Sequence, residues 1–126
     1  MGQSTPINKP VVLVVEDEPL QRIMAVELVE ECGFEVVQAW GADEAIRILE
    51  SREDIRIVFT DVDMPGSLDG VMLAAAIRDR WPPIQIIITS GCLDLKDTTL
   101  PPQSVFFSKP YQHDKVVAEL FRMAEA

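Results

Sequence analysis

The sequence predicts an α/β fold built on one parallel sheet. Short apolar runs rich in Val and Ile alternate along the chain with segments whose apolar residues recur at helical spacing. The chain has 126 residues, of which 48% are hydrophobic and 25% charged, as is ordinary for a single globular domain. Alternation of strands and helices favours βαβ units with right-handed crossovers. We therefore expect a doubly wound sheet of five parallel strands in the order 2-1-3-4-5.

Local composition defines the first elements. A polar tail at residues 1–10 precedes the globular domain, which we expect to span residues 11–126. The first strand is the unbroken run Val-Val-Leu-Val-Val, which is typical of a strand buried on both faces. The helix after it should begin at Pro19, because proline suits the first helical turn, and should stop at Gly33.

The later elements continue the alternation. The stretch 92–102 should hold the fourth helix, but it contains adjacent threonines and ends in two prolines, so we expect that helix to be short or irregular. The last helix is amphipathic. The expected strands are 11–15, 34–39, 55–60, 84–89 and 105–108, and the other expected helices are 19–31, 42–51, 71–80 and 112–126.

Charge and cysteine content exclude several functions. The chain carries 21 acidic and 11 basic residues, a net charge of -10 and a pI near 4.4. Nucleic acids and anionic membrane surfaces are bound through Lys and Arg, so we expect neither as a partner. Cys32 and Cys92 lack metal-ligand spacing and should be reduced thiols. The first residues do not form a signal peptide and no apolar run is long enough to span a membrane, so we expect a cytoplasmic protein.

Reactive side chains stand at the carboxyl ends of the predicted strands. In a doubly wound sheet these ends meet at one edge, and ligands bind where the strand order reverses. Clustered carboxylates repel one another unless a cation neutralises them, and an all-oxygen cluster suits Mg²⁺. A metal, an aspartate, a lysine and a hydroxyl together suit transfer of a phosphoryl group to the aspartate. The residues are Glu16 and Asp17 after the first strand, Asp61 after the third, Thr89 and Ser90 at the fourth, and Lys109 after the fifth.

Four motifs in the chain resemble those of the receiver domain of bacterial response regulators in two-component systems. Each is weak alone, but all four occur in the family's order at predicted strand ends. The resemblance covers about residues 10–125 and implies a flavodoxin-like (βα)5 fold and a stand-alone signalling domain whose only turnover would be slow self-dephosphorylation. The motifs are Val14-Val15-Glu16-Asp17-Glu18, Asp61-Val62-Asp63-Met64-Pro65 with Asp69-Gly70, Thr89-Ser90-Gly91 and Lys109-Pro110-Tyr111.

The resemblance implies a role for each acidic residue of these motifs. Asp61 matches the aspartate that accepts the phosphoryl group. Asp17 would bind Mg²⁺ directly and Glu16 would act through water, while the backbone carbonyl of Asp63 matches a main-chain metal ligand. The side chain of Asp63 also places a second carboxylate two positions after the acceptor, where it can influence the lifetime of the phosphoryl group.

The resemblance also implies a lysine, a switch hydroxyl and partners. Lys109 would bind a phosphoryl oxygen, and Ser90 would be the switch hydroxyl. Many receivers carry an aromatic residue three positions before the lysine, which is Phe106 in this chain and would switch by packing alone. The donor would be a sensor histidine kinase or a phosphotransfer protein, and the phosphorylated state would be relayed to a downstream protein.

Other interpretations of the same residues stay open at this stage. Ser90 could merely cap the next segment, and Phe106 could merely pack in the core. A degenerate receiver would bind a partner without phosphorylation. Asp61-Val62-Asp63 also resembles the Asp-x-Asp motif of haloacid-dehalogenase-type phosphatases, although those enzymes carry it near the N-terminus. A flavodoxin-like cofactor binder is disfavoured, because acids follow the first strand where a phosphate loop would be required. The loop at 66–70 is also one residue longer than the commonest receiver form, which loops tolerate.

Overall fold

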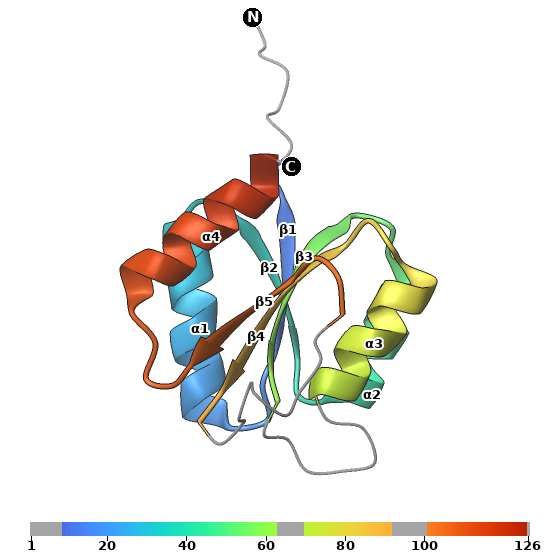
Figure 1. Cartoon of the computed structure of the whole chain (residues 1–126), viewed down its shortest axis with the longest axis horizontal. Coiled ribbons are helices and arrows are strands. Elements are labelled where there is room, and N and C mark those ends of the chain that lie inside the picture. The colour runs from blue at the N-terminus through green and yellow to red at the C-terminus, as the bar shows by residue number, and fades with distance from the viewer. Residues whose placement is uncertain (1–8, 63–69, 92–100, 126) are drawn as a thin grey trace, which may run out of the picture.

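A computed structural model describes residues 9–62, 70–91 and 101–125. In this part of the chain, five parallel strands form one sheet in the order β2-β1-β3-β4-β5, which confirms the predicted order (Figure 1). The strands are β1 (Val11–Val15), β2 (Glu35–Ala39), β3 (Ile55–Asp61), β4 (Gln85–Ser90) and β5 (Ser104–Ser108). The helices are α1 (Pro19–Glu31), α2 (Ala42–Ser51), α3 (Gly70–Arg80) and α4 (His113–Glu125).

The predicted bounds were wrong by one residue at several ends. β4 runs one residue further than expected because Ser90 pairs with Ser108 in register. The last helix begins after Gln112, whose carbonyl accepts hydrogen bonds from the backbone amides of the next turn. β2 begins after Phe34, which is buried against the core rather than paired in the sheet. The irregular fourth helix expected at 92–102 falls almost entirely outside the described residues.

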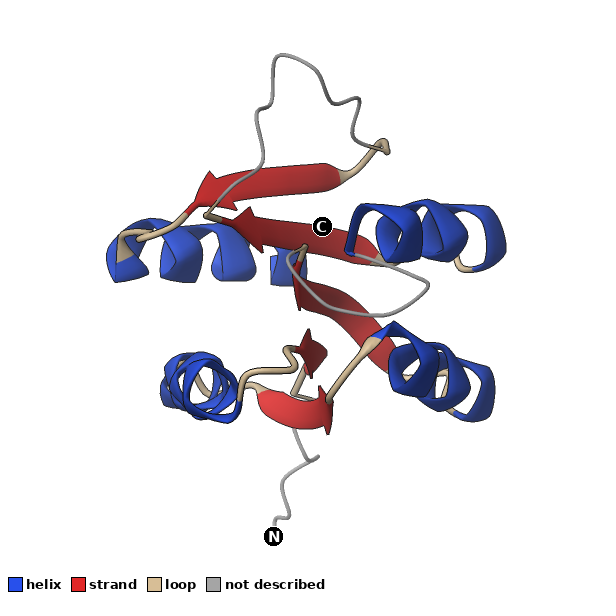
Figure 2. Ribbon diagram, turned by 90° about the horizontal axis from the view of Figure 1, so that it is seen from below, coloured by secondary structure: helices blue, strands red, loops and turns tan. Residues whose placement is uncertain are grey.

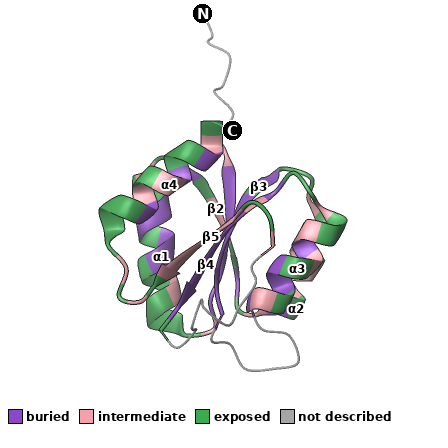
Figure 3. Ribbon diagram, viewed as in Figure 1, coloured by how far each residue is buried: buried purple, intermediate pink, exposed green. Residues whose placement is uncertain are grey.

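Helices cover both faces of the sheet. α1 and α4 lie on one face and α2 and α3 on the other (Figure 2). In β1, Leu13 and Val15 point into the core cluster under α2 and α3, while Val12 and Val14 point into the cluster under α1 and α4. Every residue of β1 is therefore buried, as its unbroken apolar run predicted (Figure 3).

The ends of α1 follow the residue signals in the sequence. The carboxylate of Glu18 accepts a hydrogen bond from the backbone N–H of Gln21 at 2.8 Å and so caps the helix, with Pro19 at its first position. Past the other end, Gly33 has a φ of 90°, a left-handed conformation that glycine adopts without strain. The expected start and stop are both confirmed.

Arg78 anchors the end of α3 to the segments that lead into β4 and β5. Its guanidinium donates to the carbonyl of Pro102 at 2.7 Å, to the carbonyl of Ile84 at 2.8 Å, and to the carbonyl of Pro82. Burial lowers the pKa of Arg78 from its ordinary value. One side chain thus satisfies carbonyls from three places in the chain, and we expect it to contribute to stability.

The carboxyl ends and the amino ends of the parallel strands form two opposite edges of the sheet, and these edges carry different residues. The strands all run toward the same edge, which brings their carboxyl ends together, whereas β1 begins and α4 ends at the opposite edge (Figure 1). The fold therefore concentrates the reactive residues of the strand ends at one edge.

Among the described helices, none combines the length and the apolar character needed to cross a membrane.

Candidate functional site

Three carboxylates meet at the carboxyl ends of β1 and β3. One oxygen each from Glu16, Asp17 and Asp61 lies within 4.8 Å of the others. Glu16 and Asp61 are only 6% and 5% exposed. They meet because β1 and β3 are neighbours in the sheet and both strands run to this edge. The sequence prediction of an acidic cluster at the switch point is thus borne out in the arrangement of these side chains.

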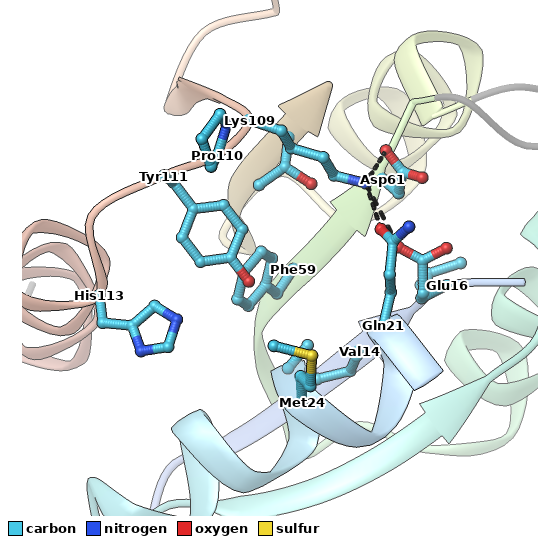
Figure 4. A pocket seen from close by; sticks show the side chains of 13 residues that line it. Val14, Glu16, Gln21, Met24, Phe59, Asp61, Lys109, Pro110, Tyr111 and His113 are labelled. Atoms are coloured by element: carbon cyan, nitrogen blue, oxygen red, sulfur yellow. Dashed lines mark hydrogen bonds and ion pairs between the residues drawn. The ribbon is translucent and has the colours of Figure 1, made fainter. Parts of the chain in front are cut away.

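Lys109 extends into this cluster from the segment after β5 (Figure 4). Its Nζ lies 3.2 Å from Asp61 Oδ1 and 3.7 Å from Glu16 Oε1. The same Nζ donates a hydrogen bond to Gln21 Oε1 at 2.6 Å. Its side chain is 23% exposed, so water screens these contacts incompletely. The ammonium therefore balances part of the negative charge of the carboxylates.

The environment of Glu16 favours its neutral form. Burial raises the pKa of Glu16 from 4.5 to about 7, and the nearby Asp61 carboxylate adds to the rise. The backbone N–H of Glu18 donates to Glu16 Oε2 at 3.1 Å, and this bond and Lys109 act in the opposite direction. Without a cation, the cluster thus resists holding all its charges at neutral pH.

Two further residues predicted for the site, Ser90 and Phe106, lie on the strands β4 and β5. Ser90 ends β4 and is 1% exposed, and its carbonyl accepts a hydrogen bond from the backbone N–H of Lys109 at 2.9 Å. Phe106 is half-buried and packs against the core cluster under α2 and α3. Its side chain thus packs beside the core, and its role as a switch residue stays a prediction. Asp63, whose carbonyl was expected as a metal ligand, lies outside the described residues.

Gly70 makes a close approach to the backbone of Asp61. A Cβ atom at position 70 would lie 2.4 Å from the Asp61 carbonyl oxygen and 2.7 Å from Val62 Cα. The backbone N–H of Gly70 donates to the carbonyl of Val62 at 3.4 Å. The first residue of α3 therefore packs directly behind the end of β3, and glycine is the residue that fits there.

A cavity of about 360 Å³ extends from the acid cluster between α1 and the start of α4. Its polar end holds Glu16, Asp61 and Lys109, and its apolar end holds Met24 and Phe59 among others. These side chains surround one hollow in Figure 4. The site thus combines a charged end with an apolar extension.

Tyr111 lines the cavity beside His113. The ring of Tyr111 lies 6.0 Å from the ring of Phe59 and 5.8 Å from the ring of His113. Burial raises the pKa of Tyr111, and the charges of Glu16 and Asp61 raise it further. The half-buried tyrosine is thus linked electrostatically to the acids, a link that the sequence analysis did not foresee.

Sequence reasoning missed Gln21 as a member of the site. Gln21 occupies the first turn of α1, close to the acid pair in sequence, and this was the available signal. Its partner Lys109 is 88 positions away, so the hydrogen bond forms only because the fold brings the segment after β5 close to the first turn of α1. The first turn of α1 is held in place by Arg22, whose Nη1 donates to the carbonyl of Glu16 at 3.1 Å.

Fold and site together define a class: a doubly wound domain with an acid cluster and a lysine at the reversal of strand order. The family described as response regulator receiver domain matches residues 12–121. The chain belongs to this family.

Curated relatives and solved structures agree with this assignment. The chain is 32% identical over 119 residues to the hydrogenase transcriptional regulatory protein HoxA of Cupriavidus necator, covering 91% of this chain and 24% of HoxA. It is 32% identical over 118 residues to the sensor kinase CckA of Brucella abortus, covering 90% of this chain and 12% of CckA. A crystal structure of a response regulator receiver domain protein from Clostridium thermocellum has a TM-score of 0.82 and 26% identity, with 91% of this chain and 94% of that chain covered. The chain therefore spans about a quarter or less of the length of these two curated relatives.

Proposed function

We propose that this receiver domain accepts a phosphoryl group on Asp61 from the phosphohistidine of a sensor histidine kinase or a phosphotransfer protein. The contact between Lys109 Nζ and Asp61 Oδ1, at 3.2 Å inside a cluster of three carboxylates, is the observation that carries the proposal. Two buried carboxylates and an ammonium have no packing role that apolar residues would not serve better. They converge at the reversal of strand order, which is where doubly wound sheets bind their ligands.

The transfer is a substitution at phosphorus. A carboxylate oxygen of Asp61 attacks the phosphorus atom, a P–O bond forms, and the P–N bond to the donor imidazole breaks. The electron pair of the broken bond leaves with the imidazole, so the products are an aspartyl phosphate and an unphosphorylated histidine. Lys109 offers its ammonium to a phosphoryl oxygen as a point charge, and the hydroxyl of Ser90 donates to another.

The acid cluster has the donor set for Mg²⁺. The oxygens of Glu16, Asp17 and Asp61 are hard ligands that lie within 4.8 Å of one another, and no Cys or His takes part in this group. When bound, the ion would neutralise the negative charge that collects on the phosphoryl oxygens. Asp17 would hold the ion directly and Glu16 through water. By the family resemblance, the backbone carbonyl of Asp63, which lies outside the described residues, would be a further ligand.

Phosphorylation would then act as a switch read by another protein. An aspartyl phosphate carries a charge of about -1.5 to -2 at this buried position, where the carboxylate carried a single negative charge. Thr89 on β4 pairs with Asp61, and Ser90 follows it with 1% of its surface exposed. Ser90 and Phe106 on the next strand would shift in response and change the surface offered to a downstream protein. The strongly negative net charge of -10 argues against a nucleic-acid partner for the domain itself, because nucleic acids are bound through Lys and Arg.

Intact-mass spectrometry after incubation with acetyl phosphate and Mg²⁺ tests the proposal. Wild type should gain one phosphoryl group, and Asp61→Asn or addition of EDTA should abolish the gain. Asp79→Asn, an exposed carboxylate of α3, is the matched control and should be phosphorylated like wild type. A wild-type protein that stays unmodified, under conditions that label a known receiver, would favour a binding module that works without phosphorylation. Rapid steady-state release of phosphate would favour a phosphatase instead.

A further inference from the structure

The ammonium of Lys109 contacts three side-chain oxygens of the site. Two belong to the carboxylates of Asp61 and Glu16, 3.2 and 3.7 Å from Nζ. The third is the neutral amide oxygen of Gln21 in α1, at 2.6 Å. The shortest contact of the ammonium is therefore with a side chain that carries no charge (Figure 4).

The position of Gln21 is fixed by the chain around it. Its backbone N–H donates to the carboxylate of Glu18 at 2.8 Å, which caps α1. The next residue, Arg22, donates to the carbonyl of Glu16 at 3.1 Å, and its guanidinium lies 5.0 Å from the ring centre of Trp40. These contacts tie the first turn of α1 to the same loop that supplies the acid pair. Gln21 itself is exposed, but it is attached to an anchored turn.

We propose that Gln21 is a positioning residue that holds the ammonium of Lys109 beside Asp61 before and during phosphoryl transfer. The inference rests on the proposed function, since it concerns the same lysine and the same acceptor.

The uncharged acceptor matters because the partners of Lys109 change during the reaction. Before transfer, the negative charge lies on the carboxylate of Asp61. After transfer, Asp61 Oδ is an ester-like oxygen and the charge lies on the phosphoryl oxygens, so the ammonium must redirect one hydrogen bond. A lysine has three N–H donors, and the one given to Gln21 can stay in place while another turns to the phosphoryl group. The ammonium then turns about its fixed hydrogen bond to Gln21 and stays close to the phosphoryl oxygens that it must bind.

Chemical reactivity of the lysine tests the contact without any phosphorylation. Each lysine would be labelled with a limiting amine-reactive ester, and the rates would be read by peptide mass spectrometry, with exposed Lys115 as the internal reference. Gln21→Met removes the acceptor at nearly constant side-chain size, so labelling of Lys109 should rise about three- to tenfold relative to Lys115. Gln21→Glu keeps an acceptor oxygen and should restore the low rate. Gln38→Met, the same change on exposed β2, should leave Lys109 unaffected. Equal labelling of Lys109 in wild type and Gln21→Met overturns the inference.

A double-mutant cycle tests the functional step. With acetyl phosphate and Mg²⁺, Gln21→Met should slow phosphorylation of Asp61 about three- to tenfold, with urea midpoints showing that the variant is folded. In a Lys109→Ala background the same substitution should have no further effect, because Gln21 acts through Lys109. An equal loss in both backgrounds contradicts a positioning role.

The two failures are distinguishable. A wild-type protein that takes up no phosphoryl group overturns the proposed function, whatever the labelling of Lys109 shows. A wild type that is phosphorylated normally, with a Gln21→Met variant identical to it in both assays, overturns the inference about Gln21 alone.

Discussion

Gly70→Ala should damage both the stability of the domain and the geometry of Asp61. The added Cβ would lie 2.4 Å from the Asp61 carbonyl oxygen, whereas ordinary van der Waals contact begins near 3.4 Å. The atoms it meets are backbone atoms at the end of β3, which cannot rotate away as a side chain could. The overlap of about 1 Å must therefore be relieved by a shift of α3 or of the acceptor residue itself.

The size of each effect follows from that overlap. Overpacking of this kind costs about 1–3 kcal/mol in the free energy of unfolding. Displacing a reacting group by about 1 Å can slow its reaction about 100-fold. We expect a lower urea midpoint by circular dichroism, and a rate of phosphorylation by acetyl phosphate that falls by one to two orders of magnitude.

Gly41→Ala is the matched control, because a Cβ at position 41 meets nothing within 4 Å. It should lose at most about 1 kcal/mol from weaker capping of α2 and keep the phosphorylation rate of wild type. If Gly70→Ala and Gly41→Ala proved equal in both stability and phosphorylation, the close approach would have no physical consequence and the reasoning would be refuted.

Three further predictions concern charge and anchoring. Because the pKa of Glu16 is about 7 in the folded protein and 4.5 ordinarily, the metal-free domain should lose stability as the pH rises from about 4.5 to 7, by at most about 3 kcal/mol. The sign follows from proton binding: in that window the unfolded chain gives up the Glu16 proton while the folded protein keeps it, so rising pH favours unfolding. Asp61→Asn removes one of the clustered charges and should raise the metal-free stability at pH 8 by about 1 kcal/mol, while reducing the extra stability that Mg²⁺ confers. Arg78→Met breaks hydrogen bonds to three carbonyls and should cost about 1–3 kcal/mol in urea denaturation without slowing phosphorylation.

Each of these predictions has its own control. Glu16→Gln should flatten the stability profile between pH 4.5 and 7, and an unchanged slope would assign it to another group. For Asp61→Asn, the control is Asp79→Asn, and equal stabilisation by both would point to overall net charge as the cause. Arg80→Met breaks an exposed ion pair with Glu50 and should change stability by less than about 1 kcal/mol. A loss as large as that of Arg78→Met would mean that the carbonyl contacts are unimportant.

The order of the sheet and the acid cluster were predictable because both depend on short-range patterns. An apolar run such as β1 reveals a strand, and the strand direction then determines where Glu16 and Asp61 must lie. No side-chain detail is required for either step. The ligand role of Asp63 was inferred from the family resemblance and not from such a pattern, and this residue lies outside the described part of the chain.

The contacts of Gln21 and Trp40 were not predictable from local patterns. Gln21 and Lys109 meet only because the fold brings the segment after β5 close to the first turn of α1, and a residue's type does not reveal such a contact. Trp40 is 65% exposed and lies under the guanidinium of Arg22, a contact that its place in the sequence does not indicate. Both features depend on the tertiary arrangement of side chains, which periodicity does not encode.

The separation of the two sheet edges has a practical consequence for handling the protein. β1 begins and α4 ends at the end of the sheet opposite Asp61 (Figure 1). A fluorophore, an affinity tag or a biosensor surface attached before β1 or after α4 would therefore leave the acid cluster facing the solution. Binding of a candidate phosphodonor could be followed in such a format without obstructing the face that it must reach.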